Sequence, residues 1–218
     1  RTLVQLKESV ERARASELKF LQAQIKPHFL YNALNTFISI SLYDMDKARS
    51  LLTEFGNYLR RSFDFKDLSQ LAPLKNEAEL ARAYLEIEKA RFEERIEAVF
   101  DLPDDLEARV PMLVLQPIVE NAVVHGILPK NEGGRIEICI RAEDSALHFR
   151  VKDNGVGMNP EKKDHIFKSE FGSGVGLSNI DSRLKKLYGE GLRICSAQGV
   201  GTEVAWRVPL NKRESESS

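Results

Sequence analysis

The sequence predicts an α+β protein in which an N-terminal helical hairpin precedes an α/β domain with a mostly antiparallel sheet. Residues 1–42 contain no Gly and a single Pro, and their apolar residues recur every three or four positions, as in a helix. Residues 136–151 alternate apolar and polar side chains around a short acidic turn, which predicts two antiparallel strands. Strands and helices do not alternate strictly, so a parallel doubly wound sheet is not expected.

Composition limits the function classes. The 218 residues include 32 Lys and Arg against 33 Asp and Glu, a net charge of −1, so we expect no nucleic-acid-binding surface. Apolar stretches such as Val110–Leu115 are far shorter than the ~20 residues that cross a bilayer, so this piece is expected to be soluble. Two cysteines without metal-ligand spacing favour a reduced, cytoplasmic compartment. The start at Arg1, without Met or signal segment, suggests a fragment of a longer protein.

Residues 1–63 are expected to form the helical hairpin. One long helix is predicted to about Leu42, and a phase shift in its apolar stripe suggests a two-stranded coiled coil; packing against its own domain is the alternative. Residues 43–46 break the pattern, and a second amphipathic helix runs to Phe63. Because a lone hairpin buries little apolar surface, we expect a homodimer that closes a four-helix bundle.

Residues 64–73 read as a linker, residues 74–210 as the α/β domain and residues 211–218 as a polar tail. Asn76 and Glu79 resemble a capping pair at the start of a helix that ends near Phe92. Pro111 is expected in the first turn of an apolar helix through Ala122. The other expected elements are strands at 96–100, 136–140, 147–151, around 194 and at 204–208, and a helix at 177–188.

Polar residues on the apolar helix form the first candidate site. Glu120 and Asn121 are followed one turn later by His125, and unpaired polar groups on a buried helix cost ~1–3 kcal/mol each. The side-chain oxygen of Asn121 is a suitable ligand for Mg²⁺. The alternative is a simple helix end, because His125 and Gly126 also form a C-terminal cap.

Two Gly-rich segments form the second and third candidates. Asp153-Asn154-Gly155-Val156-Gly157-Met158 follows a strand, and its carboxylate could accept from an exocyclic amine such as that of adenine; a plain turn is the alternative. Residues 172–177, Gly-Ser-Gly-Val-Gly-Leu, precede a helix, whose free N–H groups favour a phosphate. Alone, this pattern is weak, and it is no Walker loop because no Gly-Lys-Ser/Thr follows.

In this order, and followed by Gly199-Val200-Gly201-Thr202, the motifs resemble the ATP-binding domain shared by histidine kinases, gyrase B, Hsp90 and MutL. The resemblance covers about residues 74–210 and implies the GHKL or Bergerat-type α/β sandwich, with Asn121 on Mg²⁺ and with Asp153 and Thr202 near adenine. It also implies cofactor contacts from His125, Gly155, Gly157, Gly172, Gly174, Gly176 and Leu177. Many relatives carry a basic residue where this chain has Val124, so one phosphate contact is not matched.

The sequence of the N-terminal hairpin indicates which of these families the chain resembles most. Residues 24–35, Gln-Ile-Lys-Pro-His-Phe-Leu-Tyr-Asn-Ala-Leu-Asn, and residues 84–92 resemble the LytS-type sensor histidine kinases. The resemblance implies that His28 accepts the phosphoryl group. Pro27 removes one backbone bond and should let the helix bend beside His28. His28, Asn32 and Asn35 share one face, where a polar layer that fixes bundle register is the alternative.

The sequence is thus interpreted as a sensor histidine kinase that takes phosphate from Mg·ATP onto His28 and passes it to an Asp of a response regulator. Catalytic candidates are His28, Asn32, for dephosphorylation by analogy with other histidine kinases, and Glu120 as a possible base. The resemblance implies a membrane-anchored parent protein with this part in the cytoplasm. An ATPase or Ser kinase without phosphohistidine, and a non-catalytic nucleotide-sensing dimer, are the rival hypotheses.

Overall fold

The computed structural model describes residues 27–63, 71–103, 107–159 and 175–210. Contacts divide the chain into two compact units, Arg1–Thr53 and Glu54–Ser218. The predicted domain boundary after residue 63 remains a prediction. In the described part of the chain, no helix is both long and apolar enough to span a membrane. The predicted coiled coil before Pro27 lies outside the described residues.

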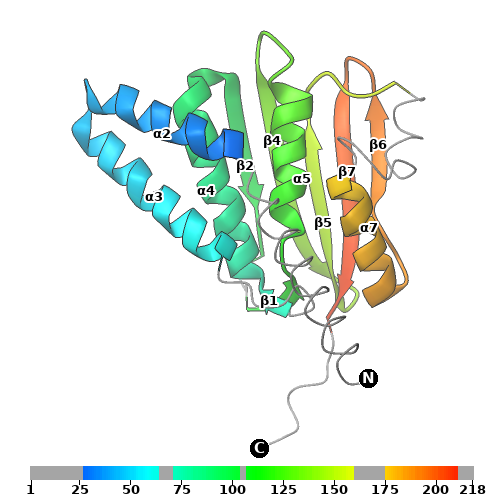
Figure 1. Ribbon diagram of the computed structural model, residues 1–218. Coiled ribbons are helices and arrows are strands. Elements are labelled where there is room, and N and C mark those ends of the chain that lie inside the picture. The colour runs from blue at the N-terminus through cyan, green and yellow to red at the C-terminus, as the bar shows by residue number, and fades with distance from the viewer. Residues whose placement is uncertain (1–26, 64–70, 104–106, 160–174, 211–218) are drawn as a thin grey trace, which may run out of the picture. The chain divides into compact units, whose positions relative to one another are not determined.

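The hairpin consists of α2 (Pro27–Ser41) and α3 (Met45–Phe63), drawn in blue and cyan in Figure 1, and α3 confirms the predicted second helix. Asp44 caps α3, because its carboxylate oxygen accepts the backbone N–H of Lys47 at 2.9 Å. The buried residues of α2 recur at helical spacing. They are Phe29, Ala33, Phe37 and Ile40, and the first part of α3 adds Ala48 and Leu51.

The second unit is built on a five-stranded sheet with the strand order β2-β4-β5-β7-β6 (Figure 1). Its strands are β2 (Ile96–Asp101), β4 (Gly134–Glu143), β5 (Ala146–Asp153), β6 (Arg193–Ala197) and β7 (Gly201–Pro209). Every neighbouring pair is antiparallel except β2 and β4, which are parallel. The expected mostly antiparallel sheet is therefore confirmed.

Helices α4 (Leu74–Phe92), α5 (Leu115–Asn121) and α7 (Val175–Tyr188) cover one face of this sheet (Figure 1). The alternating strand pattern turns one set of apolar side chains towards the helices, including the buried Ile136, Ile138 and Ile140 of β4. Phe149 of β5 stacks on Trp206 of β7 with ring centroids 4.7 Å apart. This core fixes the ends of β5 and β7, where the candidate site lies.

Two predicted helix starts were wrong. Helix α4 begins at Leu74 after Pro73 without a side-chain cap, so Asn76 lies inside its first turn. Pro111 ends strand β3 (Arg109–Pro111), which pairs with β1 (Leu71–Pro73) inside the segment expected to be a linker. Because Pro111 is paired in β3, α5 starts at Leu115, four residues later than expected.

The end of the α5 helix also differs from the simple helix end that was the alternative interpretation of His125 and Gly126. The helical path continues from α5 into a π-helical turn, η2 (Ala122–Ile127), before Leu128. The backbone N–H of Leu128 donates to the carbonyl oxygen of Val123, five residues back, at 2.9 Å. Such widened turns occur frequently at functional sites, and this one carries His125 and Gly126.

Candidate functional site

Asp153 is a buried acceptor at the end of β5, with only 3% of the residue exposed. Its Oδ1 accepts the backbone N–H of Gly155 at 2.9 Å, and the backbone N–H of Thr202 also bonds its carboxylate. Burial raises the pKa of Asp153 above its ordinary value, while these two N–H donors act in the opposite direction. The strand thus holds a carboxylate where water is largely excluded, which suits recognition of a ligand amine.

Glycines pack directly against this carboxylate. A β-carbon on Gly126 would stand 2.6 Å from Oδ1 of Asp153, and one on Gly155 would stand 2.1 Å from the backbone carbonyl carbon of Gly126. Gly201 has φ +126°, and its β-carbon would meet the Asp153 carbonyl oxygen at 2.0 Å. We call Gly126, Asp153, Gly155 and Gly201 the Asp153 cradle. Any larger residue at these glycines would displace the carboxylate or the backbone around it.

Thr202 lies opposite Asp153 in the β5–β7 register and opposite Ser196 in the β6–β7 register. The Oγ atoms of Ser196 and Thr202 are 2.8 Å apart. Ser196 also donates to the Gly201 carbonyl oxygen at 3.0 Å and accepts the Met158 N–H at 2.9 Å. Sequence reasoning missed Ser196, because only the register of two strands shows that it supports Thr202 and the segment after Asp153.

Gly157 meets the turn between β6 and β7. It has φ +62°, and a β-carbon on it would stand 2.0 Å from the Ala197 carbonyl oxygen. Beside it, the carbonyl oxygen of Val156 accepts the N–H of Gly199 at 2.8 Å. The structure therefore explains Gly157 through close backbone packing, and a contact with a ligand ring remains a prediction.

Asn121 is half-buried at the end of α5, and its Nδ2 donates to the Pro117 carbonyl oxygen at 2.8 Å. That bond occupies the amide nitrogen and leaves the side-chain carbonyl oxygen as the group suited to a cation. His125 is exposed on η2. Within the described residues, no group of three His, Cys, Asp or Glu side chains could hold a metal ion. A hard cation here would therefore rely on phosphate oxygens and water as well as Asn121, which is the usual coordination of Mg²⁺.

Glu120 points into a buried polar cluster. It is 9% exposed, and its Oε2 accepts from Nε2 of Gln116 at 3.2 Å; the same Nε2 lies 3.4 Å from the hydroxyl of Tyr58. Glu88 of α4 is also buried, and burial raises its pKa to about 7, with Arg91 opposing and the charge of Glu120 adding to the shift. This placement favours a packing role for Glu120, and its role as a base remains a prediction.

The predicted phosphate-binding glycines are described only in part. Gly172 and Gly174 lie outside the described residues. Gly176 is exposed in the first turn of α7, where a β-carbon would meet no atom within 4 Å, and Leu177 is half-buried beside it. Packing in the described structure does not require a glycine at position 176.

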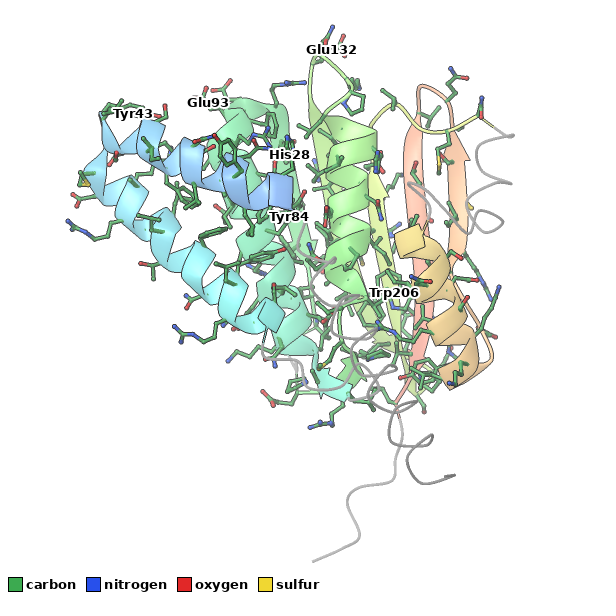
Figure 2. All side chains as sticks on the ribbon, in the orientation of Figure 1. His28, Tyr43, Tyr84, Glu93, Glu132 and Trp206 are labelled. Carbon is green, nitrogen blue, oxygen red and sulfur yellow. The ribbon has the colours of Figure 1, made fainter. Side chains whose placement is uncertain are left out.

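His28 is exposed near the start of α2 (Figure 2), in the other unit from Asp153. Nδ2 of Asn32 lies 3.1 Å from Nδ1 and 3.2 Å from Nε2 of its imidazole. This i, i+4 contact confirms that the two side chains share a helix face. Asn35 is exposed one turn further on. The predicted bend at Pro27 depends on residues outside the described part.

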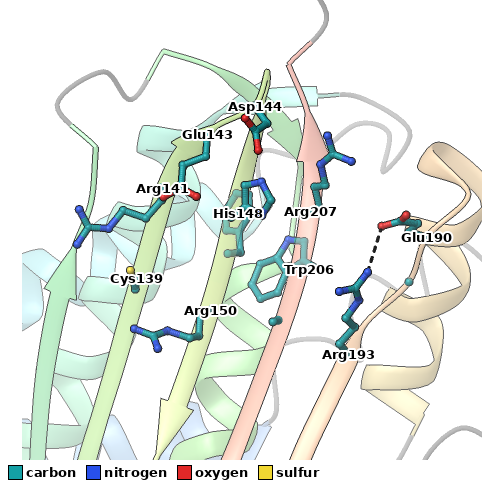
Figure 3. A pocket seen from close by; sticks show the side chains of 13 residues that line it. Cys139, Arg141, Glu143, Asp144, His148, Arg150, Glu190, Arg193, Trp206 and Arg207 are labelled. Atoms are coloured by element: carbon teal, nitrogen blue, oxygen red, sulfur yellow. Dashed lines mark ion pairs between the residues drawn. The ribbon is translucent and has the colours of Figure 1, made fainter.

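A separate hollow of about 640 Å³ lies among β4, β5, β6 and β7 (Figure 3). Its charged lining includes Arg141 and Arg150, whose strand positions alternate with the buried Ile138, Ile140, Phe149 and Val151. The hollow therefore opens on the sheet face opposite the helices. None of the predicted site residues lines it, so it is distinct from the Asp153 cradle.

Two known families match successive parts of the chain. The family "Histidine kinase" matches residues 16–96. The family "Histidine kinase-, DNA gyrase B-, and HSP90-like ATPase" matches residues 107–212. The first match contains His28 and Asn32, and the second contains Asn121 and the Asp153 cradle.

Curated relatives align with nearly the whole chain. YwpD of Bacillus subtilis is 43% identical over 95% of this chain and 75% of its own length. The sensor histidine kinase YpdA of Escherichia coli is 37% identical over 91% of this chain, and the sensor protein LytS of Bacillus subtilis is 35% identical over 90%. The chain spans 35% and 34% of the lengths of these two sensors, so it corresponds to about a third of each.

Solved structures share the fold at low identity. The catalytic domain of the histidine kinase ThkA matches with a TM-score of 0.52 and 21% identity over 64% of this chain and 96% of that domain. The histidine kinase domain of a blue-light activated kinase from Erythrobacter litoralis matches with a TM-score of 0.51 and 21% identity over 91% of this chain and 94% of that chain. Together the two family matches cover most of the chain, which belongs to the histidine kinase family, and its relatives include the LytS-type sensor proteins.

Proposed function

We propose that this chain binds Mg·ATP at the Asp153 cradle and transfers the γ-phosphoryl group to His28. The observation that carries the proposal is the cradle itself, a buried carboxylate packed closely against glycine backbone where β5 and β7 meet. An exposed imidazole in the other unit supplies the acceptor. Transfer requires these two sites to meet at the phosphoryl group.

Adenine recognition would depend on Asp153. The exocyclic amine of adenine carries two hydrogens that it can donate. A buried anionic acceptor therefore binds adenine more strongly than it binds a base that lacks this amine. Because Ser196 donates its hydroxyl hydrogen to Gly201, Thr202 donates to Ser196, and the Thr202 oxygen is left as an acceptor for the base or a bridging water. A contact of Gly155 and Gly157 with the flat ring is part of the same proposal.

The phosphate end would be held near Asn121. Its side-chain oxygen is the group that fits Mg²⁺, while the Pro117 carbonyl fixes the amide orientation. Mg²⁺, when bound, would neutralise charge on the β- and γ-phosphates. His125, Gly172, Gly174, Gly176 and Leu177 are proposed as further contacts to the nucleotide.

In the transfer step, an unprotonated ring nitrogen of His28 attacks the γ-phosphorus. A nitrogen–phosphorus bond forms, the bond from γ-phosphorus to the bridging oxygen breaks, and ADP leaves with that electron pair. The remaining ring proton passes to a base, for which Glu120 is the candidate.

We also propose a homodimer. Helix α2 exposes a stripe of large apolar side chains at a spacing of three to four residues, and α3 adds an exposed leucine. These residues are Tyr31, Leu34 and Ile38 of α2, Leu42 directly after it and Leu52 of α3, with exposures from 46% to 84%. A second hairpin related by a two-fold axis would cover both stripes at once and complete a four-helix bundle.

We propose the partner and the cellular setting by analogy with the relatives. The relatives named as sensors extend well beyond the region that matches this chain. We therefore propose that this chain is the cytoplasmic kinase part of a membrane-anchored sensor. In this setting, phosphorylated His28 donates its phosphoryl group to an Asp of a response regulator.

Incubation with γ-labelled ATP tests the proposed chemistry. A phosphoramidate is hydrolysed in acid and survives alkali, whereas a phosphoserine survives acid. Acid-labile, alkali-stable label on the protein is the expected result. Acid-stable label would instead support a Ser kinase, while hydrolysis without label would support an ATPase. Nucleotide binding with neither would support a nucleotide-sensing dimer.

A further inference from the structure

Glu77 of α4 is a buried carboxylate, only 2% exposed, that bonds the start of α5. It accepts the backbone N–H of Leu113 at 2.7 Å and those of Val114 and Leu115 at 3.0 Å each. The first N–H groups of a helix have no partner within that helix. Glu77 supplies this partner from a residue 36 to 38 positions away, and its negative charge is favoured at a helix N-terminus.

Arg183 of α7 holds the same turn from the opposite side. Its guanidinium donates to the carbonyl oxygen of Met112 and, at 3.2 Å, to that of Leu113. Leu113 has φ +52°, a left-handed conformation that is unfavourable for a residue with a β-carbon. Glu77 therefore binds the N–H groups of this turn, and Arg183 binds its carbonyl groups. Opposite charges on two other helices together hold a strained backbone in place.

Burial and charge agree with this arrangement. Burial raises the pKa of Glu77, and the three N–H donors together with the charge of Arg183 act in the opposite direction. Burial lowers the pKa of Arg183, and Glu77 opposes that shift. Each group therefore helps to keep the other charged inside the domain.

The turn is the starting point of the segment that carries the proposed metal ligand. Asn121 lies six residues after Leu115, less than two helical turns along α5. The segment continues through η2 to Gly126, which packs against Asp153. Asp153 itself is held independently by the central strands. A short helical segment moves as a unit, so the placement of its start determines where Asn121 stands relative to Asp153.

We infer that Glu77 and Arg183 are positioning residues that set the Asn121 side chain at the separation from Asp153 that Mg·ATP requires. This inference rests on the proposed function. Neither residue touches the nucleotide in this account, since both act through the backbone of residues 112–115. Their effect should therefore fall on the metal-dependent part of ATP affinity, while recognition of adenine by Asp153 remains.

The test compares ATP affinity with Mg²⁺ and with EDTA, measured by calorimetry on the full chain. Glu77→Gln keeps the shape but places an amide donor against backbone donors, and Arg183→Lys keeps the charge but loses the forked geometry. Loss of a residue that orients a ligand typically costs roughly 10- to 100-fold in metal affinity. In each variant we expect the ratio of ATP affinity with Mg²⁺ to ATP affinity in EDTA to fall about tenfold, while the affinity in EDTA stays unchanged.

Glu79→Gln is the matched control. Glu79 lies two residues further along α4, and its carboxylate pairs with Arg61 at 2.5 Å, away from the start of α5. This variant should keep the wild-type ratio of the two affinities. Thermal unfolding of every variant identifies the folded fraction, and Arg183→Lys is the milder change if Glu77→Gln does not fold.

The outcomes separate this inference from the proposed function. Folded variants with the wild-type ratio of affinities would overturn it, and so would a parallel loss of both affinities, which indicates a purely structural role. A wild-type chain that binds no ATP would overturn the proposed function, and the inference with it. A wild type that binds ATP, together with an unchanged ratio in both variants, would overturn only the inference.

Discussion

Nδ2 of Asn32 lies 3.1 Å from Nδ1 of His28 and 3.2 Å from Nε2, so the amide stands beside both ring nitrogens of the proposed phosphoacceptor. An amide nitrogen is a donor only, so it can donate to whichever ring nitrogen carries a lone pair. We propose that the same amide, once His28 has given up its phosphoryl group, orients a water on a docked regulator.

Replacing Asn32 by Ala should retain phosphorylation of His28 and slow the loss of phosphate from the phosphorylated response regulator. The physical reason is that the amide orients the attacking water, whereas transfer to His28 needs only the imidazole. Rates of both steps with the paired regulator check this prediction. Asn35→Ala, one turn further along α2, is the control and should behave as wild type. Equal dephosphorylation by wild type and Asn32→Ala would refute the catalytic role.

Asp153→Asn should weaken ATP binding by about 1–3 kcal/mol, the range for a hydrogen bond to a charged group. The amide keeps the shape of the side chain but replaces an anionic acceptor with a donor that faces the N–H groups of Gly155 and Thr202. Calorimetry of ATP binding measures the change. Asp144→Asn, in the turn at the other end of β5, should leave the affinity unchanged. An unaltered affinity in Asp153→Asn would exclude its role as the adenine reader.

The exposed stripe on α2 predicts that charge at its centre prevents dimer formation. Ile38 is 64% exposed, and Ile38→Glu would bury a carboxylate against apolar side chains in the proposed bundle. Light scattering at micromolar concentration should show a dimer for wild type and a monomer for Ile38→Glu. Lys47→Gln, exposed on α3, should remain dimeric. A wild-type monomer with full helicity would contradict the bundle.

Glu88 predicts a specific pH dependence of stability. Its pKa of about 7 in the folded chain exceeds the ordinary value of 4.5, so folding favours the protonated form. Its contribution is fully present below pH 4.5 and is lost as the pH rises through 7, a difference of about 3 kcal/mol. Glu88→Gln should therefore stabilise the protein more at pH 8 than at pH 5 in denaturant unfolding. Glu86→Gln, exposed on the same helix, should show no such difference. An equal effect of Glu88→Gln at both pH values would contradict the shift.

The fold was predictable where one face of an element is buried. The alternation around Ile138 and Val151 predicted β4 and β5, and the helical spacing from Ala48 to Phe63 predicted most of α3. Met45 and Asp46, which were expected to break the pattern, instead begin α3. The start of α5 was not predictable, because its cap is Glu77, more than thirty residues earlier in the chain. The parallel pairing of β2 with β4 was not predictable either, because it depends on tertiary contacts and not on the sequence of either strand alone.

The candidate site was predictable to the same extent. Asp153, Gly155 and Thr202 were predicted from their motifs, and the structure brings them together. Ser196 and the role of Gly126 were missed, because strand register and the π-helical turn place them there. Glu120 was predicted as a candidate base because it stands next to Asn121. In the structure, its side chain contacts Gln116 in a buried polar cluster.

A comparison of phosphorylation in wild type and in His28→Gln tests most directly the central claim that His28 accepts the phosphoryl group from ATP. The full chain is incubated with γ-labelled ATP, and the label is located by its acid and alkali stability and by peptide mass. The account predicts acid-labile label on His28 in wild type and in His148→Gln, a histidine of the central sheet, and none in His28→Gln, with ATP affinity unchanged. Label of equal amount and equal acid lability on His28→Gln would contradict the account.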